Sequence, residues 1–159
     1  MQQNKLDTAQ RNKLHISQHN KRDIDKAMAN NITMAVCSTS NDRVVRAIVR
    51  NLLGKEREHG FAGIYAGDMV PRKKPDPAVY NLAARELELN PAECVVIEDS
   101  RNGMLAAVAE GMNCLVTLAS YTVDEDFSEA DKVVRDLGDN PGVVNLSDLN
   151  EIVRRRLLK

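Results

Sequence analysis

Three short segments of this chain carry side chains that bind phosphate groups and metal ions in proteins. Small hydroxyl and amide residues occupy positions 38–41, directly after the apolar run 34–37. Lys74 stands before a Pro-Asp-Pro turn, and two adjacent carboxylates at 98–99 follow a second apolar run. A hydroxyl, an ammonium and a carboxylate pair together have the chemistry of a phosphate and magnesium site.

The first two segments are the candidate phosphate-binding groups. Ser38 follows a predicted buried strand, and Thr39 and Asn41 lie between that strand and the next predicted helix. Backbone N–H groups and a helix N-terminus at such a turn suit an anion. Lys74, held by the stiff turn that follows it, can bring a positive charge to a phosphoryl oxygen. We therefore predict that Ser38, Thr39, Asn41 and Lys74 bind phosphate.

The third segment is the candidate metal site. Glu98 and Asp99 offer hard oxygen ligands, and Mg²⁺ takes one or two carboxylates and completes its shell with water and phosphate. Each signal has an ordinary alternative: a serine after a strand is usually a turn residue, and Lys74 can be a solvated surface charge. Asp99 or Ser100 can simply cap the following helix. The order of the segments and their shared placement at strand ends favour a binding site.

The elements that must position these groups alternate between strand and helix, which indicates an α/β fold with a doubly wound parallel sheet. Ligands bind such sheets outside the carboxyl ends of the strands, where Ser38 and Asp99 both fall. The predicted strands are 33–37, 61–66, 94–97, 114–118 and a short edge strand at 131–134. The predicted helices are 23–30, a helix from Asn41 to Gly54 that buries Val44, Val45, Ile48 and Leu52, a helix from Pro77 to about 87, 102–110, and a last helix capped by Ser147.

The bulk composition argues against several partners. With 22 basic and 23 acidic residues among 159, the chain gives no electrostatic reason to bind nucleic acid or a membrane surface. No apolar stretch approaches the roughly 20 residues of a membrane-spanning helix. The three dispersed cysteines are typical of buried thiols in a reducing compartment. We expect a cytoplasmic protein, with a plastid or another organelle as the alternative. Residues 1–31 are predicted to be a polar, partly helical lead-in, and residues 32–159 the core domain.

These motifs together resemble the haloacid dehalogenase (HAD) superfamily, and more narrowly its CbbY-like and β-phosphoglucomutase-like branch. The resemblance rests on segments 36–41, 67–68 with 73–77, and 95–100, and it continues through the run 121–127. It implies a Mg²⁺-dependent phosphohydrolase that acts on a small phosphorylated sugar through an aspartyl-phosphate. It would make Ser38 and Lys74 catalytic groups that hold the transferring phosphoryl group, and Asp99, with Glu98 beside it, the metal site.

One part of the family pattern is missing. The family's first motif is an apolar strand that ends in D-x-D and supplies the nucleophile, and a cap domain follows it. The only D-x-D here, at residues 23–25, follows basic residues and precedes Lys26. We interpret its two acids as a pair near the N-terminus of a helix, where the helix dipole favours them.

The missing strand is central in the family, so we predict an incomplete HAD-like Rossmannoid core whose first-motif central strand is not evident. Its absence leaves the backbone groups of two buried strands unpaired. The only upstream stretch that could substitute is the short segment 14–16. A partner chain that completes the sheet is the other possibility.

Three functions remain open from the sequence. The leading hypothesis is the C-terminal part of the core of a CbbY-like sugar phosphatase, through truncation or an incomplete gene model, without its nucleophile. The second is a non-catalytic phosphate- or Mg²⁺-binding or partner module. The third is a phospho-acceptor signalling domain with Asp99 as acceptor, against which the turn at 74–77 argues.

Overall fold

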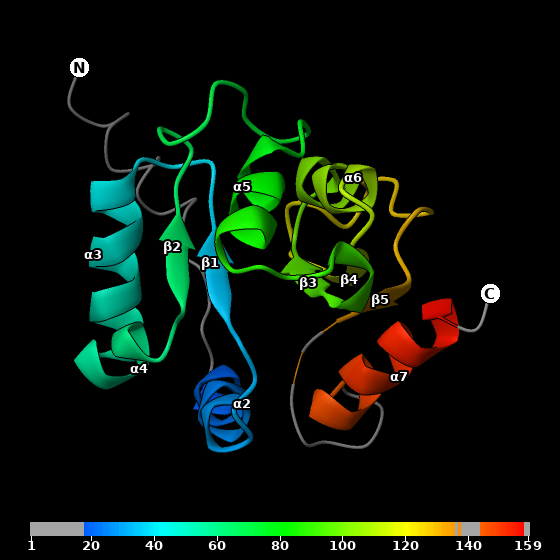
Figure 1. The fold of residues 1–159 in the computed structure, drawn as a ribbon. Coiled ribbons are helices and arrows are strands. Elements are labelled where there is room, and N and C mark those ends of the chain that lie inside the picture. The colour runs from blue at the N-terminus through cyan, green and yellow to red at the C-terminus, as the bar shows by residue number, and fades with distance from the viewer. Residues whose placement is uncertain (1–17, 136, 138–143, 158–159) are drawn as a thin grey trace.

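The strands of the protein form two separate parallel sheets, as the computed structural model shows for residues 18–135, 137 and 144–157 (Figure 1). Strand β1 (Ala35–Cys37) pairs with β2 (Gly63–Tyr65). The second sheet has the order β3 (Val95–Glu98), β4 (Asn113–Thr117), β5 (Lys132–Val134). No described strand lies between β1 and β3. The predicted α/β class and parallel pairing are confirmed.

Helices connect the strands and cover them. They are α2 (Gln18–Ala29), α3 (Asp42–Leu53), α4 (Lys55–His59), α5 (Ala78–Glu86), the short 3₁₀ helix η1 (Pro91–Glu93), α6 (Arg101–Ala109) and α7 (Leu146–Leu157). Helix α5 contacts β1 and β2 of the first sheet and also α6, which packs on β3 and β4 of the second. It therefore links the two sheets, and Figure 1 shows it in front of the space between them. None of the helices described here is long and apolar enough to cross a membrane.

Local capping explains where several helices begin. The Asn41 side chain accepts a hydrogen bond from the Val44 N–H at 3.0 Å, and Ser100 accepts one from the Gly103 N–H at 3.2 Å. Gly54 ends α3 with φ +86°, a conformation that glycine adopts without the steric cost other residues meet. Both α3 and α6 thus begin directly after the segments singled out by the sequence.

Some predicted details are wrong. Helix α3 buries Val45, Val49 and Leu53, four residues apart, whereas Val44 is exposed. The last helix is capped by Asn145, whose side chain accepts from the Ser147 N–H at 2.8 Å, and Ser147 itself lies inside the helix. Helices α4 and η1 were not predicted, because runs of five and three residues are too short to show an apolar period.

The two sheets differ in how completely they are buried. Every residue of β4 from Asn113 to Val116 is buried, as expected for a central parallel strand. Strands β1 and β3 have no fully buried residue, and the Ile97 side chain on β3 is 46% exposed. The strands β1 and β3, which face the space between the sheets, are therefore less covered than their partners β2 and β4.

The register between β3 and β4 provides a test of this difference. Ile97 pairs with Leu115, which is fully buried. Leu115→Ala is expected to lower the free energy of unfolding by about 2–5 kcal/mol. Ile97→Ala should cost about half as much or less, because much of its apolar surface stays in water in either state. Chemical denaturation measures both variants, and an equal loss would contradict the exposed position of Ile97.

Candidate functional site

The polar segments meet at the carboxyl ends of β1 and β3. Ser38 directly follows β1, and its N–H donates to the Tyr65 carbonyl at the end of β2. Its hydroxyl oxygen accepts from the Ser40 N–H at 3.2 Å. Among the described residues, no hydrogen bond uses the backbone N–H of Thr39 or Asn41. In the described part of the chain, this turn therefore presents free backbone donors at the edge of the sheet.

A glycine allows a second loop to pack against this turn. The Gly67 N–H donates to the Ser40 carbonyl at 2.8 Å. A Cβ atom on Gly67 would lie 2.2 Å from the Thr39 carbonyl oxygen, so no larger residue fits without moving the backbone. The neighbouring Asp68 carboxylate accepts a hydrogen bond at 3.0 Å from the N–H of Asp42, the first residue of α3.

Lys74 joins the carboxyl ends of the two sheets. Its ammonium donates to the Cys37 carbonyl at the end of β1 at 3.0 Å, and to the Tyr80 hydroxyl on α5 at 2.8 Å. It also forms an ion pair with Glu98, the last residue of β3. The Lys74 and Glu98 side chains are only 7% and 11% exposed. Lys74 is therefore a buried charge at the centre of the site and not a solvated surface lysine.

Tyr80 completes this network. Its hydroxyl donates to the same Glu98 oxygen, and the Lys74 ammonium lies 4.5 Å from the centre of its ring. Burial, with the Glu98 charge second, raises the pKa of the Tyr80 phenol far above its ordinary value. Burial likewise raises the pKa of the Cys37 thiol to about 12. Tyr80 thus stays a neutral donor, and Cys37 is no thiolate nucleophile.

The two predicted metal-site acids have different surroundings. One Glu98 oxygen is held by Lys74 and Tyr80, and its carboxylate packs against Gly103, where a Cβ atom would lie 2.0 Å from the other oxygen. Asp99 is half-buried and accepts a hydrogen bond from the exposed Tyr121 hydroxyl at 2.7 Å. That hydrogen bond raises the pKa of Tyr121 to about 12.

The donor set at this edge fits Mg²⁺ through Asp99. Tyr121 donates to one of the two Asp99 carboxylate oxygens. The other oxygen is left for a cation, whose shell water and phosphate would complete. Glu98 fits less well, because its charge is already paired with Lys74. Within the described part of the chain no three His, Cys, Asp or Glu side chains are grouped as metal ligands. The roles of Ser38, Thr39, Asn41, Lys74, Glu98 and Asp99 remain predictions.

The D-x-D segment lies elsewhere. Asp23 and Asp25 are in the middle of α2, which begins at Gln18, so the expected placement near a helix N-terminus is wrong. Both oxygens of Asp25 accept from the Arg57 guanidinium, each at 2.7 Å. An ion pair with α4 therefore explains this acid in place of the helix dipole.

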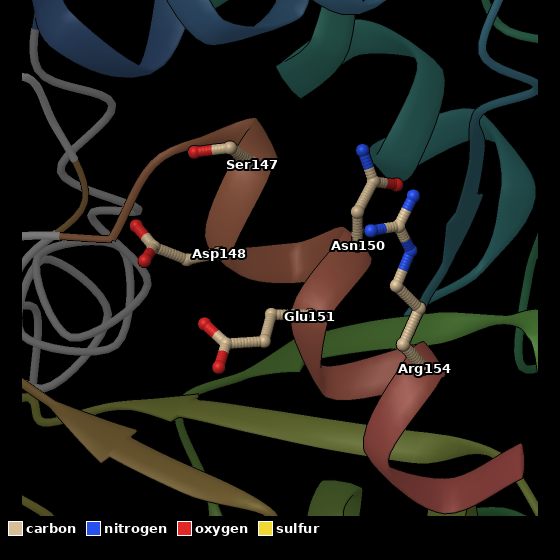
Figure 2. Close-up of a pocket in the computed structure, with 5 residues that line it drawn as sticks. All are labelled: Ser147, Asp148, Asn150, Glu151 and Arg154. Carbon is tan, nitrogen blue, oxygen red and sulfur yellow. The ribbon is translucent and has the colours of Figure 1, made fainter. Parts of the chain in front are cut away.

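A second polar hollow, on α7, does not gather its side chains. Figure 2 shows Ser147, Asp148 and Glu151 extending from one side of the helix, and Asn150 and Arg154 from the other. Helix α7 contacts η1, which leads into the amino end of β3. The hollow is thus not at the carboxyl ends of β1 and β3, where Ser38, Lys74 and Asp99 lie.

Three residues of the site were not predicted from the sequence. Tyr80 and Tyr121 come from loops and helices whose position depends on the tertiary fold, and a lone tyrosine carries no spacing signal. Gly103 stands five residues after the end of β3, inside helix α6, where glycine is unfavourable, and this position was the available signal.

Comparison with known proteins decides the family. The model of the haloacid dehalogenase-like hydrolases matches residues 21–111, more than half of the chain. The chain belongs to this family. A CBBY-like protein of Arabidopsis thaliana is 56% identical over 117 residues, which are 74% of this chain and 36% of that protein. The predicted CbbY-like branch of the superfamily is therefore confirmed.

Solved structures of the haloacid dehalogenase-like family agree with this assignment. CbbY from Rhodobacter sphaeroides in complex with phosphate is 41% identical, with a TM-score of 0.66 over 69% of this chain and 49% of that one. A variant of it was crystallised in complex with xylulose-(1,5)bisphosphate. A β-phosphoglucomutase from Clostridium difficile, 22% identical with a TM-score of 0.69, shows the same fold. The chain spans about half or less of the length of these CbbY-type relatives.

The buried ion pair can be tested by stability. Lys74→Met leaves the Glu98 carboxylate buried without a counter-charge and is expected to cost about 3–5 kcal/mol of unfolding free energy. Adding Glu98→Gln to this variant should recover much of that loss, because no charge then stays buried. Arg155→Met, which breaks an exposed pair with Glu151, is the control and should change stability by less than about 1 kcal/mol. Chemical denaturation of the three variants and the unsubstituted protein gives the comparison. A double variant that is no more stable than Lys74→Met alone would contradict the pairing.

The bond between Tyr121 and Asp99 has a pH signature. The pKa of the Tyr121 phenol is about 12 in the folded protein, above its ordinary value of 10.0. The stability that the hydrogen bond contributes is therefore complete below pH 10 and is lost as the pH rises through 12. Asp99→Ala should lower the midpoint of the Tyr121 titration toward 10, measured by tyrosinate absorbance. Glu151→Ala on α7 is the control and should leave the titration unchanged.

Proposed function

We propose that this chain is the phosphate- and magnesium-binding part of a CbbY-type phosphohydrolase core that acts on a small phosphorylated sugar. The observation that carries the proposal is the convergence of the Ser38 turn, Lys74 and Asp99 on one edge of the sheet. The likeness to a CbbY crystallised with phosphate, and to a variant of it crystallised with a sugar bisphosphate, supports it. The free thiols of the three cysteines suit the cytoplasm or a plastid as its location.

Different residues of the site would supply the hydrogen bonds, the positive charge and the metal ligand that bind a phosphoryl group. The Ser38 hydroxyl accepts from the Ser40 N–H and keeps its own proton to donate to a phosphoryl oxygen. The backbone N–H groups of Thr39 and Asn41 can donate to the same anion. Lys74 supplies a full positive charge in a site with little water, where charge stabilisation is strongest. Asp99 would hold Mg²⁺, which when bound neutralises charge on phosphoryl oxygens.

A second candidate function is a binding module without turnover. An aspartyl-phosphate route needs a carboxylate nucleophile facing the phosphoryl group. In the described chain the D-x-D acids sit in α2, and Asp25 is committed to Arg57. This observation favours phosphate and Mg²⁺ binding without hydrolysis as the function of the 159-residue chain.

Hydrolysis and binding assays separate the two functions. The enzyme proposal predicts Mg²⁺-dependent release of phosphate from p-nitrophenyl phosphate and xylulose bisphosphate, reduced at least about a hundredfold by Ser38→Ala or Asp99→Asn. Ser147→Ala on α7 is the matched control and should keep full activity. Phosphate binding by calorimetry without turnover would instead support the binding module. If the protein neither binds phosphate nor hydrolyses either ester, both functions are overturned.

A further inference from the structure

Tyr121 stands on a loop that the rest of the molecule holds firmly. The loop consists of residues 119–125, after β4, and we call it the Tyr121 loop. Its buried Thr122 closes a tight turn: the Thr122 N–H donates to the Ala119 carbonyl at 3.0 Å, and its hydroxyl accepts from the Ala119 N–H at 3.2 Å. The Glu125 carboxylate accepts at 2.5 Å from the N–H of the first residue of α6. The backbone on both sides of Tyr121 is thus anchored.

The Tyr121 loop and Asp99 come from neighbouring strands. Strands β3 and β4 are parallel, and Glu98 at the end of β3 lies opposite Val116, one residue before the end of β4. Asp99 and the loop therefore leave the sheet side by side at its carboxyl edge. The Tyr121 hydroxyl spans the gap between them and donates to one Asp99 oxygen at 2.7 Å.

This hydrogen bond orients the Asp99 carboxylate. Within residues 18–135, 137 and 144–157, no other hydrogen bond or ion pair involves this carboxylate. The Tyr121 side chain is 66% exposed and gains little from burial, so its contact with Asp99 is not a by-product of core packing. Rotation of the carboxylate is therefore restrained by Tyr121.

Mg²⁺ and Ca²⁺ make different demands on such a carboxylate. Mg²⁺ demands near-ideal octahedral geometry, whereas Ca²⁺ accepts flexible arrangements in which a carboxylate supplies one or both oxygens. A carboxylate held through one oxygen offers the other in a fixed direction, which suits the stricter ion. A carboxylate that is free to rotate can turn both oxygens toward a cation, which suits the more tolerant one.

We propose that Tyr121 is a positioning residue that orients the Asp99 carboxylate for Mg²⁺ and makes the site discriminate against Ca²⁺. The inference rests on the proposed function, in which Asp99 holds Mg²⁺. Hydrogen bonds to metal ligands are typically worth about ten- to a hundredfold in metal affinity. Loss of the Tyr121 hydroxyl affects the strict ion more than the tolerant one, so it changes the choice between them.

Metal titrations of the full chain test the proposal. Binding of MgCl₂ and CaCl₂ at constant ionic strength is followed by the NMR chemical shifts of the amides of residues 98–100. Tyr121→Phe removes only the hydroxyl and should weaken Mg²⁺ binding about tenfold. Ca²⁺ binding should change less than about twofold, so the preference for Mg²⁺ falls at least about fivefold. Since both ions are titrated into the same variant, a loss of folded protein cannot change this preference.

A neighbouring residue of the Tyr121 loop provides the matched control. Val123 is 59% exposed, and Val123→Ala should change the preference for Mg²⁺ over Ca²⁺ less than about twofold. An unchanged preference in Tyr121→Phe would overturn the proposal. A change of the same size in Val123→Ala would overturn it too, because any disturbance of the loop would then have that effect.

Asp99→Asn separates this proposal from the proposed function. If Mg²⁺ binds and Asp99→Asn weakens its binding at least about tenfold, but Tyr121→Phe leaves the preference unchanged, Asp99 holds the metal and only the role of Tyr121 is wrong. If Mg²⁺ does not shift these amides, or if Asp99→Asn leaves its binding unchanged, Asp99 is not a magnesium ligand and both proposals are overturned.

Discussion

The contact between Lys74 and Glu98 is the constraint on which this structure depends. It is a buried ion pair between the ends of two sheets that share no strand hydrogen bonds. Burying two charges is costly unless the geometry supplies further hydrogen bonds. Here the Cys37 carbonyl and the Tyr80 hydroxyl supply them. Together with the packing of α5, this network fixes the relative position of the Ser38 turn and Asp99.

The same network limits how the site can bind a ligand. An ammonium has three donors, and the Cys37 carbonyl, the Tyr80 hydroxyl and the Glu98 carboxylate accept from it. A phosphoryl oxygen must therefore displace one of these partners or share its donor. Tyr80 is the neutral side chain among them, so its displacement costs the least electrostatic energy. Tyr80, which was not predicted as a site residue, is thus the side chain that would adjust in the proposed phosphate complex.

Much of the fold and of the site could be predicted from local sequence. Continuous apolar runs gave β1, β3 and β4, and capping residues gave the starts of α3 and α6, because these signals depend on near neighbours. The placement of Asp23 and Asp25 could not be predicted, since the ion pair of Asp25 comes from Arg57, 32 residues away. The Glu98 environment was missed for the same reason: its partners Lys74 and Tyr80 arrive from another part of the chain.

The division of the sheet has a consequence for how the chain gains and loses structure. The apolar cluster around β1, α3 and β2 is built wholly from residues between Ile24 and Ala66, whereas the other two clusters draw mainly on later residues. Contacts that are close in sequence form early and cost little loop entropy. The amino-terminal cluster is therefore a local cooperative unit that can form before the rest of the chain, and it can open without melting the carboxyl-terminal sheet.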